Sequence, residues 1–231
     1  MRIGTQISNA LREYEKLKGL ACWFVIALVI AAPGQTTQSA KPSTDEMLER
    51  SLPGNEVDYF TTTDAFHMSL GRIGMIGGSV RILDCHGDYF KQLWSPLNKT
   101  LRQALVTIVE TDSRYRWQVA DEVINLLPAA GEPALLQTRI SEFRAENITS
   151  GIDTVTPLLK LPEVQKAMHD LNLKPGIAVF VTSPSRKPFS VTCKGLTLRQ
   201  VLNAIARAQG RIVWDYVETH CGDRNEVIIR F

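Results

Sequence analysis

Cysteine and histidine side chains offer most of the reactive chemistry in this sequence. The four histidines are scattered, but two short segments each combine one cysteine with one histidine, Asp84–Asp88 (DCHGD) and Glu218–Asn225 (ETHCGDRN). Thiolate and imidazole groups bind zinc, and a thiol beside a histidine base can act as a nucleophile. Zinc sites usually combine two separated ligand motifs, however, and residues adjacent in sequence rarely have catalytic geometry. A small exported metal-binding or enzymatic protein is therefore the alternative interpretation, and it would use Cys85, His86, Cys193, His220 and Cys221.

The same cysteines are candidates for a disulfide. Cys193 is the last residue of a predicted strand and Cys221 lies in the second of the two segments. In an exported protein these two could pair, and the bridge would add roughly 3 kcal/mol of stability. Cys85 would then be an unpaired thiol, either buried or available for pairing between chains.

An internal repeat organises the rest of the chain. The tetrapeptide TLRQ occurs at Thr100–Gln103 and again at Thr197–Gln200. Aligning 100–117 with 197–214 without a gap gives 8 identities in 18 positions, and both segments end in tryptophan. Such self-similarity indicates two copies of one structural unit. We expect the two tryptophans to share a packing role.

Each TLRQ also carries the signature of a helix start. In a capping box, the Thr hydroxyl accepts a hydrogen bond from the third helical N–H, and the Gln side chain accepts one from the N–H of the Thr. We predict these caps at Thr100 with Gln103 and at Thr197 with Gln200. Loss of one such cap costs about 1 kcal/mol.

The N-terminus has the order of an export signal. A segment with four basic residues leads into the unbroken apolar run Leu20–Ala32, which is short for a membrane-spanning helix. We expect residues 1–34 to be a signal peptide, with an uncleaved N-terminal anchor as the alternative. The protein would then be exported, either periplasmic or anchored in the inner membrane through residues 20–32. Residues 35–53 are polar and rich in Ser and Thr, which predicts a linker.

Charge excludes one large class of partner. Without residues 1–34 the chain keeps 22 basic and 22 acidic residues. Nucleic-acid binding normally requires an excess of positive charge, so we expect no nucleic-acid partner. The sequence shows no nucleophile elbow, HExxH motif or pair of positioned carboxylates, and we expect no cofactor, no metal and no catalytic residue.

The folded part is predicted to contain two tandem α+β domains, at 54–130 and 135–231. Periodicity and turn residues predict helices and strands in both. The predicted strands are Val57–Thr62, Ser79–Asp84, Tyr115–Val119, Val123–Leu127, Arg139–Ala145, Ile177–Thr182, Phe189–Cys193, 211–217 and Glu226–Phe231, and the predicted helices are Asp64–Ile76, 100–111, Thr154–Leu159, 162–171 and 197–209. The glycines of Gly71–Gly78 lie within and after a predicted helix, so we interpret them as helix termination and close packing, not as a phosphate loop.

The pattern resembles a known family. The segment 65–127, and more clearly 189–231 with its alternating strand, Thr-Leu-x-x-x-Leu-x-x-Ile helix and final hairpin, is similar to the secretin and TonB N-terminal short domain. The resemblance implies two βαβ-type units, each with two helices packed against small β-sheets. It also implies a periplasmic, non-enzymatic role in protein contacts. No barrel or secretin pore segment accompanies it here, so transport is not carried over.

From this resemblance we expect an exported, non-catalytic cell-envelope protein, an accessory in secretion or signalling. Its partner would be another envelope protein, and the chain could also associate with copies of itself as a homo-oligomer. The copies differ most in the last hairpin, where Glu218–Asn225 replaces a tight turn near Ala120. We therefore take His220, Cys221 and Asp223 as a candidate functional loop.

Overall fold

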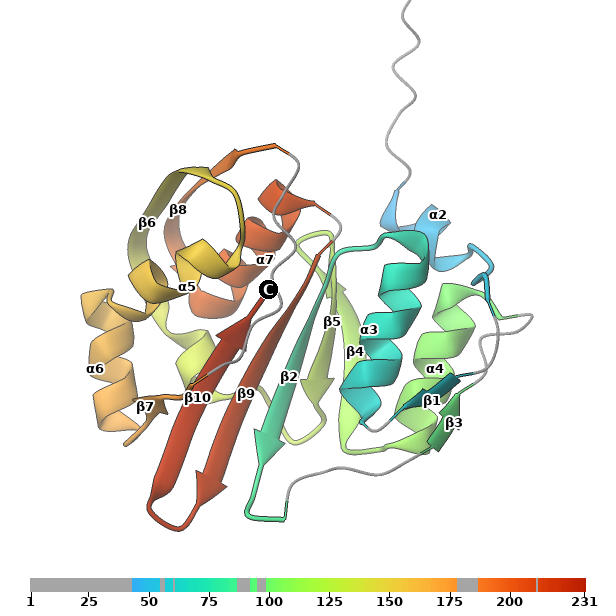
Figure 1. Ribbon diagram of the computed structural model, residues 1–231, viewed down its shortest axis with the longest axis horizontal. Coiled ribbons are helices and arrows are strands. Elements are labelled where there is room, and N and C mark those ends of the chain that lie inside the picture. The colour runs from blue at the N-terminus through green and yellow to red at the C-terminus, as the bar shows by residue number, and fades with distance from the viewer. Residues whose placement is uncertain are drawn as a thin grey trace, which may run out of the picture. The chain divides into compact units, whose positions relative to one another are not determined.

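The computed structural model describes residues 43–54, 57–59, 61–86, 92–94, 99–177, 187–210 and 212–231. Pro42–Phe231 forms one compact unit that contains both helices and sheets (Figure 1). The predicted α+β class is confirmed. The predicted signal segment 1–34 and most of the predicted strand Ile177–Thr182 lie outside the described residues.

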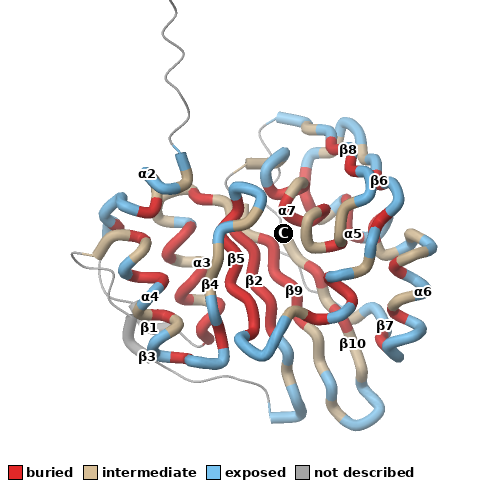
Figure 2. The backbone as a smooth tube through the Cα atoms, turned by 180° about the vertical axis from the view of Figure 1, so that it is seen from behind, coloured by how far each residue is buried: buried red, intermediate tan, exposed pale blue. Residues whose placement is uncertain are grey.

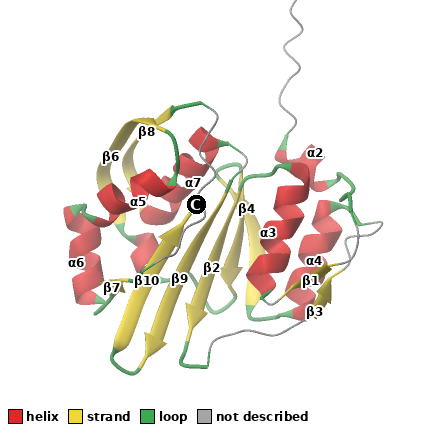
Figure 3. Cartoon of the chain, viewed as in Figure 1, coloured by secondary structure: helices red, strands yellow, loops and turns green. Residues whose placement is uncertain are grey.

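Helices and strands alternate along both halves of the chain (Figure 3). The first half contains α2 (Thr44–Leu48), β1 (Val57–Tyr59), α3 (Thr62–Ile73), β2 (Gly77–Leu83), β3 (Gln92–Trp94), α4 (Leu101–Thr111), β4 (Tyr115–Ala120) and β5 (Val123–Pro128). The second half contains η1 (Ala134–Gln137), β6 (Arg139–Ile148), α5 (Ile152–Leu159), α6 (Pro162–Asp170), β7 (Lys174–Pro175), β8 (Phe189–Thr197), α7 (Leu198–Gln209), β9 (Val213–Cys221) and β10 (Arg224–Arg230). In the described part of the chain, no helix is long and apolar enough to cross a membrane.

One six-stranded sheet takes strands from both halves. Its order is β4-β5-β2-β9-β10-β7, while β1 with β3 and β6 with β8 form two small antiparallel sheets. Strand β2 pairs in parallel with β5 on one side and with β9 on the other. The predicted domains 54–130 and 135–231 are therefore not two separate compact units, because the pairing of β2 with β9 joins them into one sheet.

The repeat is visible in how the sheet is built. Each half contributes an antiparallel hairpin and a third strand. In the first half the hairpin is β4–β5, and β2 lies parallel to β5. In the second half the hairpin is β9–β10, and β7 lies parallel to β10. The capped helix that precedes each hairpin is α4 in the first half and α7 in the second. The two copies meet where the third strand of the first copy pairs with the first strand of the second.

The equivalent tryptophans lie on opposite faces of this sheet. Across the strands, Trp117 pairs with Leu126, Leu126 with Ser79, and Ser79 with Asp215, so all four side chains are on one face. Trp214 precedes Asp215 and lies on the other face. Trp117 accordingly packs against the core of α3 and α4, whereas Trp214 is fully buried in the core that contains α7. The second copy is thus turned over relative to the first, and the predicted packing role is confirmed for both side chains.

The turned-over arrangement buries both faces of the middle strands. Val80 of β2 and Leu127 of β5 are fully buried in the core of the second copy, although both belong to the first. Figure 2 shows buried residues concentrated in β5, β2 and β9, with exposed backbone at the far ends of the strands. Burial on both faces is typical of strands in the middle of a sheet that has helices on both sides.

Two glycines let the helix and the sheet approach closely. A Cβ atom on Gly77 would lie 2.1 Å from Leu70 Cδ1 of α3, and one on Gly78 would lie 2.0 Å from the Trp214 indole. Gly74 ends α3 in the left-handed conformation, with φ of 65°. The predicted roles of these glycines in helix termination and close packing are confirmed.

Both predicted capping boxes are present. The Gln103 N–H donates to the Thr100 hydroxyl (3.3 Å), and the Thr100 N–H donates to the Gln103 side chain (2.9 Å). The same two bonds, of 3.3 and 3.0 Å, join Thr197 and Gln200. The repeated TLRQ therefore starts equivalent helices, as predicted.

Two local predictions are wrong. The predicted strand Val57–Thr62 ends at Tyr59, because Thr61 caps α3 through a capping box with Asp64. The predicted linker 35–53 is wrong over its described part, since α2 forms there and Leu48 and Leu52 are buried in the first core. The two buried leucines, and backbone hydrogen bonds from Leu52 to Lys99 and from Leu101 to Arg50, hold this segment against the protein.

Candidate functional site at the seam between β2 and β9

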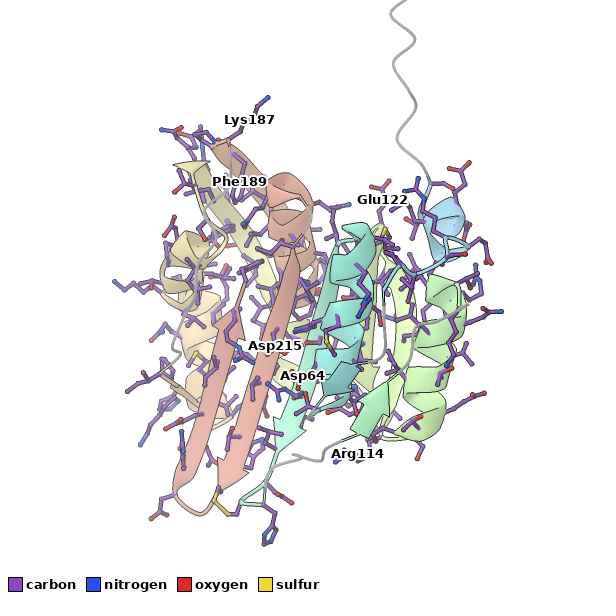
Figure 4. The ribbon with its side chains drawn as sticks, turned by 45° about the vertical axis from the view of Figure 1, so that its right-hand side comes forward. Asp64, Arg114, Glu122, Lys187, Phe189 and Asp215 are labelled. Carbon is purple, nitrogen blue, oxygen red and sulfur yellow. A yellow bond between two sulfur atoms is a disulfide. The ribbon has the colours of Figure 1, made fainter. Side chains whose placement is uncertain are left out.

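The two halves meet along one pair of parallel strands, which we call the seam. The seam runs from Gly77 opposite Val213 to Leu83 opposite Thr219. Polar side chains gather on the face of the seam that α3 covers, around Asp215 (Figure 4). Buried polar groups in such a position require partners, so their arrangement decides what the site can do.

Three residues from three elements form a hydrogen-bonded chain. Ser79 of β2 lies opposite Asp215 of β9, and its hydroxyl donates to Asp215 Oδ1 at 2.7 Å. His67 of α3 places Nε2 2.8 Å from the same hydroxyl oxygen. Ser79 is fully buried and Asp215 is 3% exposed. The side chains of both halves are therefore joined under α3.

The direction of these bonds distinguishes the chain from a catalytic triad. In a triad the histidine accepts the serine proton, while a carboxylate receives the other ring N–H. Here the Ser79 proton is committed to Asp215, so the bond from His67 Nε2 requires an N–H donor on the ring. His67 cannot accept the Ser79 proton in this arrangement. The geometry supports holding the two strands together, not nucleophilic attack.

Two arginines complete the surroundings of Asp215. Arg81 of β2 lies 3.4 Å from Asp215 Oδ2, and Arg230 of β10 also pairs with this oxygen. Burial alone would raise the pKa of the Asp215 carboxyl, but the cationic side chains around it and the Ser79 hydroxyl hold that pKa below its usual value. Asp215 is thus a buried carboxylate whose charge is compensated by groups from the two neighbouring strands, β2 and β10.

Burial, which would raise the pKa of Asp215, acts on the pKa of His67 in the opposite direction. It lowers the pKa of this histidine below its ordinary value, and the nearby carboxylates of Asp215 and Asp64 oppose the shift only in part. A neutral imidazole with its proton on Nε2 satisfies the bond to Ser79. The buried chain is therefore complete when His67 is uncharged.

A disulfide closes the end of the seam. Cys85 and Cys221 are joined, with their Cα atoms 4.6 Å apart. They are separated by 136 residues, as are Ser79 and Asp215, so the disulfide continues the register of β2 with β9 beyond Leu83. Figure 4 shows it at the far end of β9.

The predicted disulfide between Cys193 and Cys221 is wrong, and so is the expectation that Cys85 is unpaired. Cys193 lies on β8, in a small sheet with β6, and its side chain is buried in the second core as a free thiol. Burial raises the pKa of this thiol. The prediction assumed that each half folds separately, whereas the parallel seam brings Cys85 of the first half to Cys221.

The predicted functional loop is also wrong in form. His220 and Cys221 belong to β9, and only Gly222 and Asp223 form the turn before β10. His220 Nε2 donates to Glu218 Oε1 at 2.7 Å. The second hairpin therefore differs from the first by longer strands, not by a longer loop, because Cys221 pairs with Arg224 next to the turn.

The disulfide brings the Cys85–His86 and His220–Cys221 pairs of the metal-binding alternative to one end of the seam, but the five residues do not form a ligand set. Cys85 and Cys221 are in the disulfide, Cys193 is in the core and His220 pairs with Glu218. The His86 N–H donates to the Asp84 side chain in a local turn. Among the described residues, no group of three or more His, Cys, Asp or Glu side chains could hold a metal ion.

The repeated arginines of TLRQ have a positional role that the sequence did not reveal. Arg199 of α7 lies 2.8 Å from Glu132 and 3.8 Å from Asp121, in the turn of the first hairpin. Arg102 of α4 lies 2.5 Å from Glu49, just after α2. Each arginine thus joins its capped helix to the segment that lies against it.

His67, Ser79 and Asp215 were not singled out by the sequence. A signal was present for two of them, since Ser79 and Asp215 interrupt strands whose neighbours Val80 and Tyr216 are apolar. A polar residue in such a strand marks either the solvent face or a buried bond, and alternation alone does not separate these cases. Knowledge of the β2–β9 pairing is needed to do so.

Comparison with known proteins identifies no relative of this chain. No protein-family model, no curated protein and no solved structure matches the chain. The resemblance to the secretin and TonB N-terminal short domain stays a prediction.

Proposed function

We propose that this protein is an exported, non-catalytic component of the cell envelope that acts by binding other proteins, as an accessory to secretion or signalling. One observation carries the proposal: the repeated unit accepts a strand along the outer edge of its hairpin. In the second copy that edge, on β9, is occupied by β2. In the first copy the equivalent edge, on β4, pairs with no strand in the described part of the chain.

The free edge of β4 presents specific backbone groups. Ala120 and Val123 flank a two-residue turn, and residues in that position exchange hydrogen bonds with each other. Backbone groups alternate along a strand, so the N–H and C=O of Trp117 and Val119 point away from β5. The second copy supports this assignment, because Ile212, which is equivalent to Tyr115, accepts a bond from the Gly77 N–H of β2. Addition of a strand to such an edge is a common mode of peptide recognition.

Export is supported by two independent features. Residues 1–34 have the order of a signal segment. The Cys85–Cys221 disulfide belongs to an oxidising compartment, since such bonds are rare in reducing cytosol. A disulfide at the end of the seam also keeps the two copies joined where no reductant maintains thiols.

A photo-crosslinking residue at Val119 tests the proposal in cells that produce the protein. Val119 of β4 is 42% exposed, and Val106 of α4, which is 38% exposed, offers a matched control away from the edge. We expect adducts in the envelope fraction from position 119 and not from position 106. Equal labelling from both positions, or none from 119, would contradict strand recognition at β4.

Elemental analysis separates the metal-binding alternative. Stoichiometric zinc or copper in the purified protein, lost in Cys221→Ser, would favour that function over protein binding. We expect neither the metal nor its loss, because the Cys221 thiol is consumed in the disulfide.

A further inference from the structure

The free edge of β4 is complementary to itself when two copies of the chain lie side by side. We infer that β4 pairs antiparallel with β4 of a second copy of this chain, around a two-fold axis at Gln118, so that the two sheets become continuous. This inference rests on the proposed function, because it names the partner of the same edge. The contact runs from Arg114 to Glu122, and the structure describes every residue of this segment.

Two residues of β4 supply the backbone groups for such a pair. Trp117 and Val119 point their N–H and C=O groups away from β5, and Tyr115 lies on the same side of the strand. The Tyr115 N–H, however, donates to the Asp112 oxygen at 3.1 Å. The groups left for a partner strand are therefore those of Trp117 and Val119. All of them are used when Trp117 of each chain lies opposite Val119 of the other, because such a pair exchanges both N–H···O bonds.

Neighbouring registers use these groups less well. An axis at Trp117 would place Val119 opposite Tyr115, whose N–H is already bonded. An axis at Val119 would place Trp117 opposite Asp121, which lies in the hairpin turn with φ of 53° and cannot continue a ladder of extended residues. An axis at Arg116 would place like charges directly opposite each other, which destabilises a strand pair. The inferred axis avoids these conflicts.

Charges at the two ends of the strand complement each other in this register. Arg114 precedes β4 and Glu122 follows it, at opposite ends of the strand (Figure 4). Antiparallel pairing brings Glu122 of one chain beside Arg114 and Arg116 of the other, and long side chains reach across such opposite and diagonal positions. Arg116 is exposed, whereas Arg114 also binds the buried Asp112 carboxylate. The same complementary contact forms twice, because the two-fold axis repeats it.

The turn that carries Glu122 has an unfavourable backbone conformation. Asp121 and Glu122 have φ of 53° and 60°, in a two-residue turn where sequences such as Asn-Gly are usual. From α7, Asn203 donates to Asp121 Oδ2 at 3.2 Å, and Arg199 lies 3.8 Å from the same oxygen. Glu122 is exposed and pairs with no side chain of the described residues. Strain of this kind persists where the surroundings impose it and clusters at functional sites, so the turn holds a carboxylate ready at the end of the free edge.

Apolar side chains at the edge also favour self-association. Val119 is 42% exposed, and Trp117 on the same face is only partly buried. Pairing sets Val119 of each chain against Trp117 of the other, and an aromatic residue opposite a β-branched one is a favourable cross-strand pair. The seam shows that the repeated unit has room for a strand on this side, since β2 occupies the equivalent edge of β9.

A dimer of this kind is closed. Both copies contribute the same patch around the two-fold axis, which is the commonest symmetry of soluble oligomers. An exposed strand edge is a template for uncontrolled pairing, and the dimer covers the β4 edge of both chains at once. Pairing with itself therefore satisfies the edge without forming an open chain of molecules.

Cysteine cross-linking of the full-length chain tests the register. At the axis the two copies of Gln118 form a pair without backbone hydrogen bonds, whose Cα atoms lie about 4.5 Å apart, within disulfide range. We therefore expect Gln118→Cys to give a covalent dimer on mild oxidation. Ala120→Cys, on the same face of β4, is the matched control. Its two copies would lie on the order of 13 Å apart along the strands, so we expect no such product from it.

Sedimentation of charge variants provides the second measurement. We expect concentration-dependent dimerisation of the unsubstituted chain, weakened about tenfold or more by Glu122→Arg and by Arg116→Glu, because each sets like charges beside one another at both ends of the pair. The double variant Arg116→Glu/Glu122→Arg restores opposite charges and should dimerise more tightly than either single variant. Lys166→Glu on α6, whose parent side chain is 77% exposed, should leave dimerisation unchanged.

The outcomes separate this inference from the proposed function. A monomer at every concentration, a double variant no tighter than the single ones, or a cross-link from Ala120→Cys in place of Gln118→Cys would overturn the inference. Adducts of Val119 with a different envelope protein, from a chain that stays monomeric, would also overturn it while leaving the proposed function intact.

Discussion

The Ser79 hydroxyl of β2 donates a 2.7 Å hydrogen bond to Asp215 Oδ1 of β9, 136 residues further along the chain. Both residues are buried, and each belongs to a different copy of the repeat. Hydrogen bonds to a charged partner contribute about 1.5–3 kcal/mol, and an unsatisfied buried carboxylate oxygen costs more than an exposed one. The seam is therefore specified by polar contacts as well as by apolar packing.

We expect Ser79→Ala to lower the free energy of unfolding by about 1.5–3 kcal/mol, because Asp215 and His67 both lose their bond to the hydroxyl. Urea unfolding followed by far-ultraviolet circular dichroism measures the change. Ser113→Ala, at an exposed turn position, is the matched control and should stay within about 0.5 kcal/mol of the unsubstituted protein. Equal effects of the two substitutions would show that the Ser79 hydroxyl contributes nothing specific.

His67 gives the stability a predictable dependence on pH. Burial lowers its pKa in the folded protein. The nearby carboxylates of Asp215 and Asp64 raise this pKa in part, and Arg81 and Arg230 lower it further. Below about pH 6.5 the unfolded chain binds the proton more readily than the folded one. Stability therefore falls as the pH decreases below that value, by at most about 1.4 kcal/mol per pH unit for one proton.

The substitution His67→Gln isolates this contribution. A glutamine amide can still donate to Ser79 but does not titrate, so we expect the stability difference from the unsubstituted protein to shrink or reverse between about pH 6.5 and 5. Urea unfolding at several pH values measures it. His169→Gln, whose side chain is 91% exposed in the parent protein, should leave the pH dependence unchanged. Parallel curves for His67→Gln and the parent would rule out the assigned role of His67.

Reduction should destabilise the protein through the seam. The Cys85–Cys221 bridge spans 136 residues, and the entropy of a loop of that length corresponds to about 5 kcal/mol as an upper value. We expect a reductant to lower the unfolding midpoint of the parent protein and to have no effect on the Cys85→Ser/Cys221→Ser double variant. Cys193→Ala keeps the bridge and should keep the response to reductant. A reductant response that depends on Cys193 would instead restore the Cys193–Cys221 pairing.

Local features of this fold could be predicted from the sequence, and long-range pairing could not. Thr100 with Gln103 and Thr197 with Gln200 cap their helices as predicted, because a capping box involves residues only three positions apart. The helix termination at Gly74 follows from a similarly local cause. Strand hairpins such as β4–β5 are likewise signalled by the residues that form them.

The seam depends on information that a single sequence does not carry. The repeat indicated two copies but not that β2 of one copy pairs with β9 of the other. Without that register, Cys193 and Cys221 of the second copy were the natural pair, and Ser79 and Asp215 looked like separate polar residues. The correct disulfide and the buried polar chain follow together from one parallel pairing, and both were missed for the same reason.

Two glycines give the sharpest test of how closely the copies pack. Alanine at Gly78 would place a Cβ atom 2.0 Å from the fully buried Trp214 indole, whereas at Gly71 of α3 no neighbouring atom lies within 4 Å. We expect Gly78→Ala to cost about 1–3 kcal/mol or more, because the seam must widen or Trp214 must leave its position. Gly71→Ala should be neutral or stabilising by up to about 1 kcal/mol, since alanine favours the helix. Urea unfolding combined with Trp fluorescence measures both, and a neutral Gly78→Ala would contradict the close approach of β2 to Trp214.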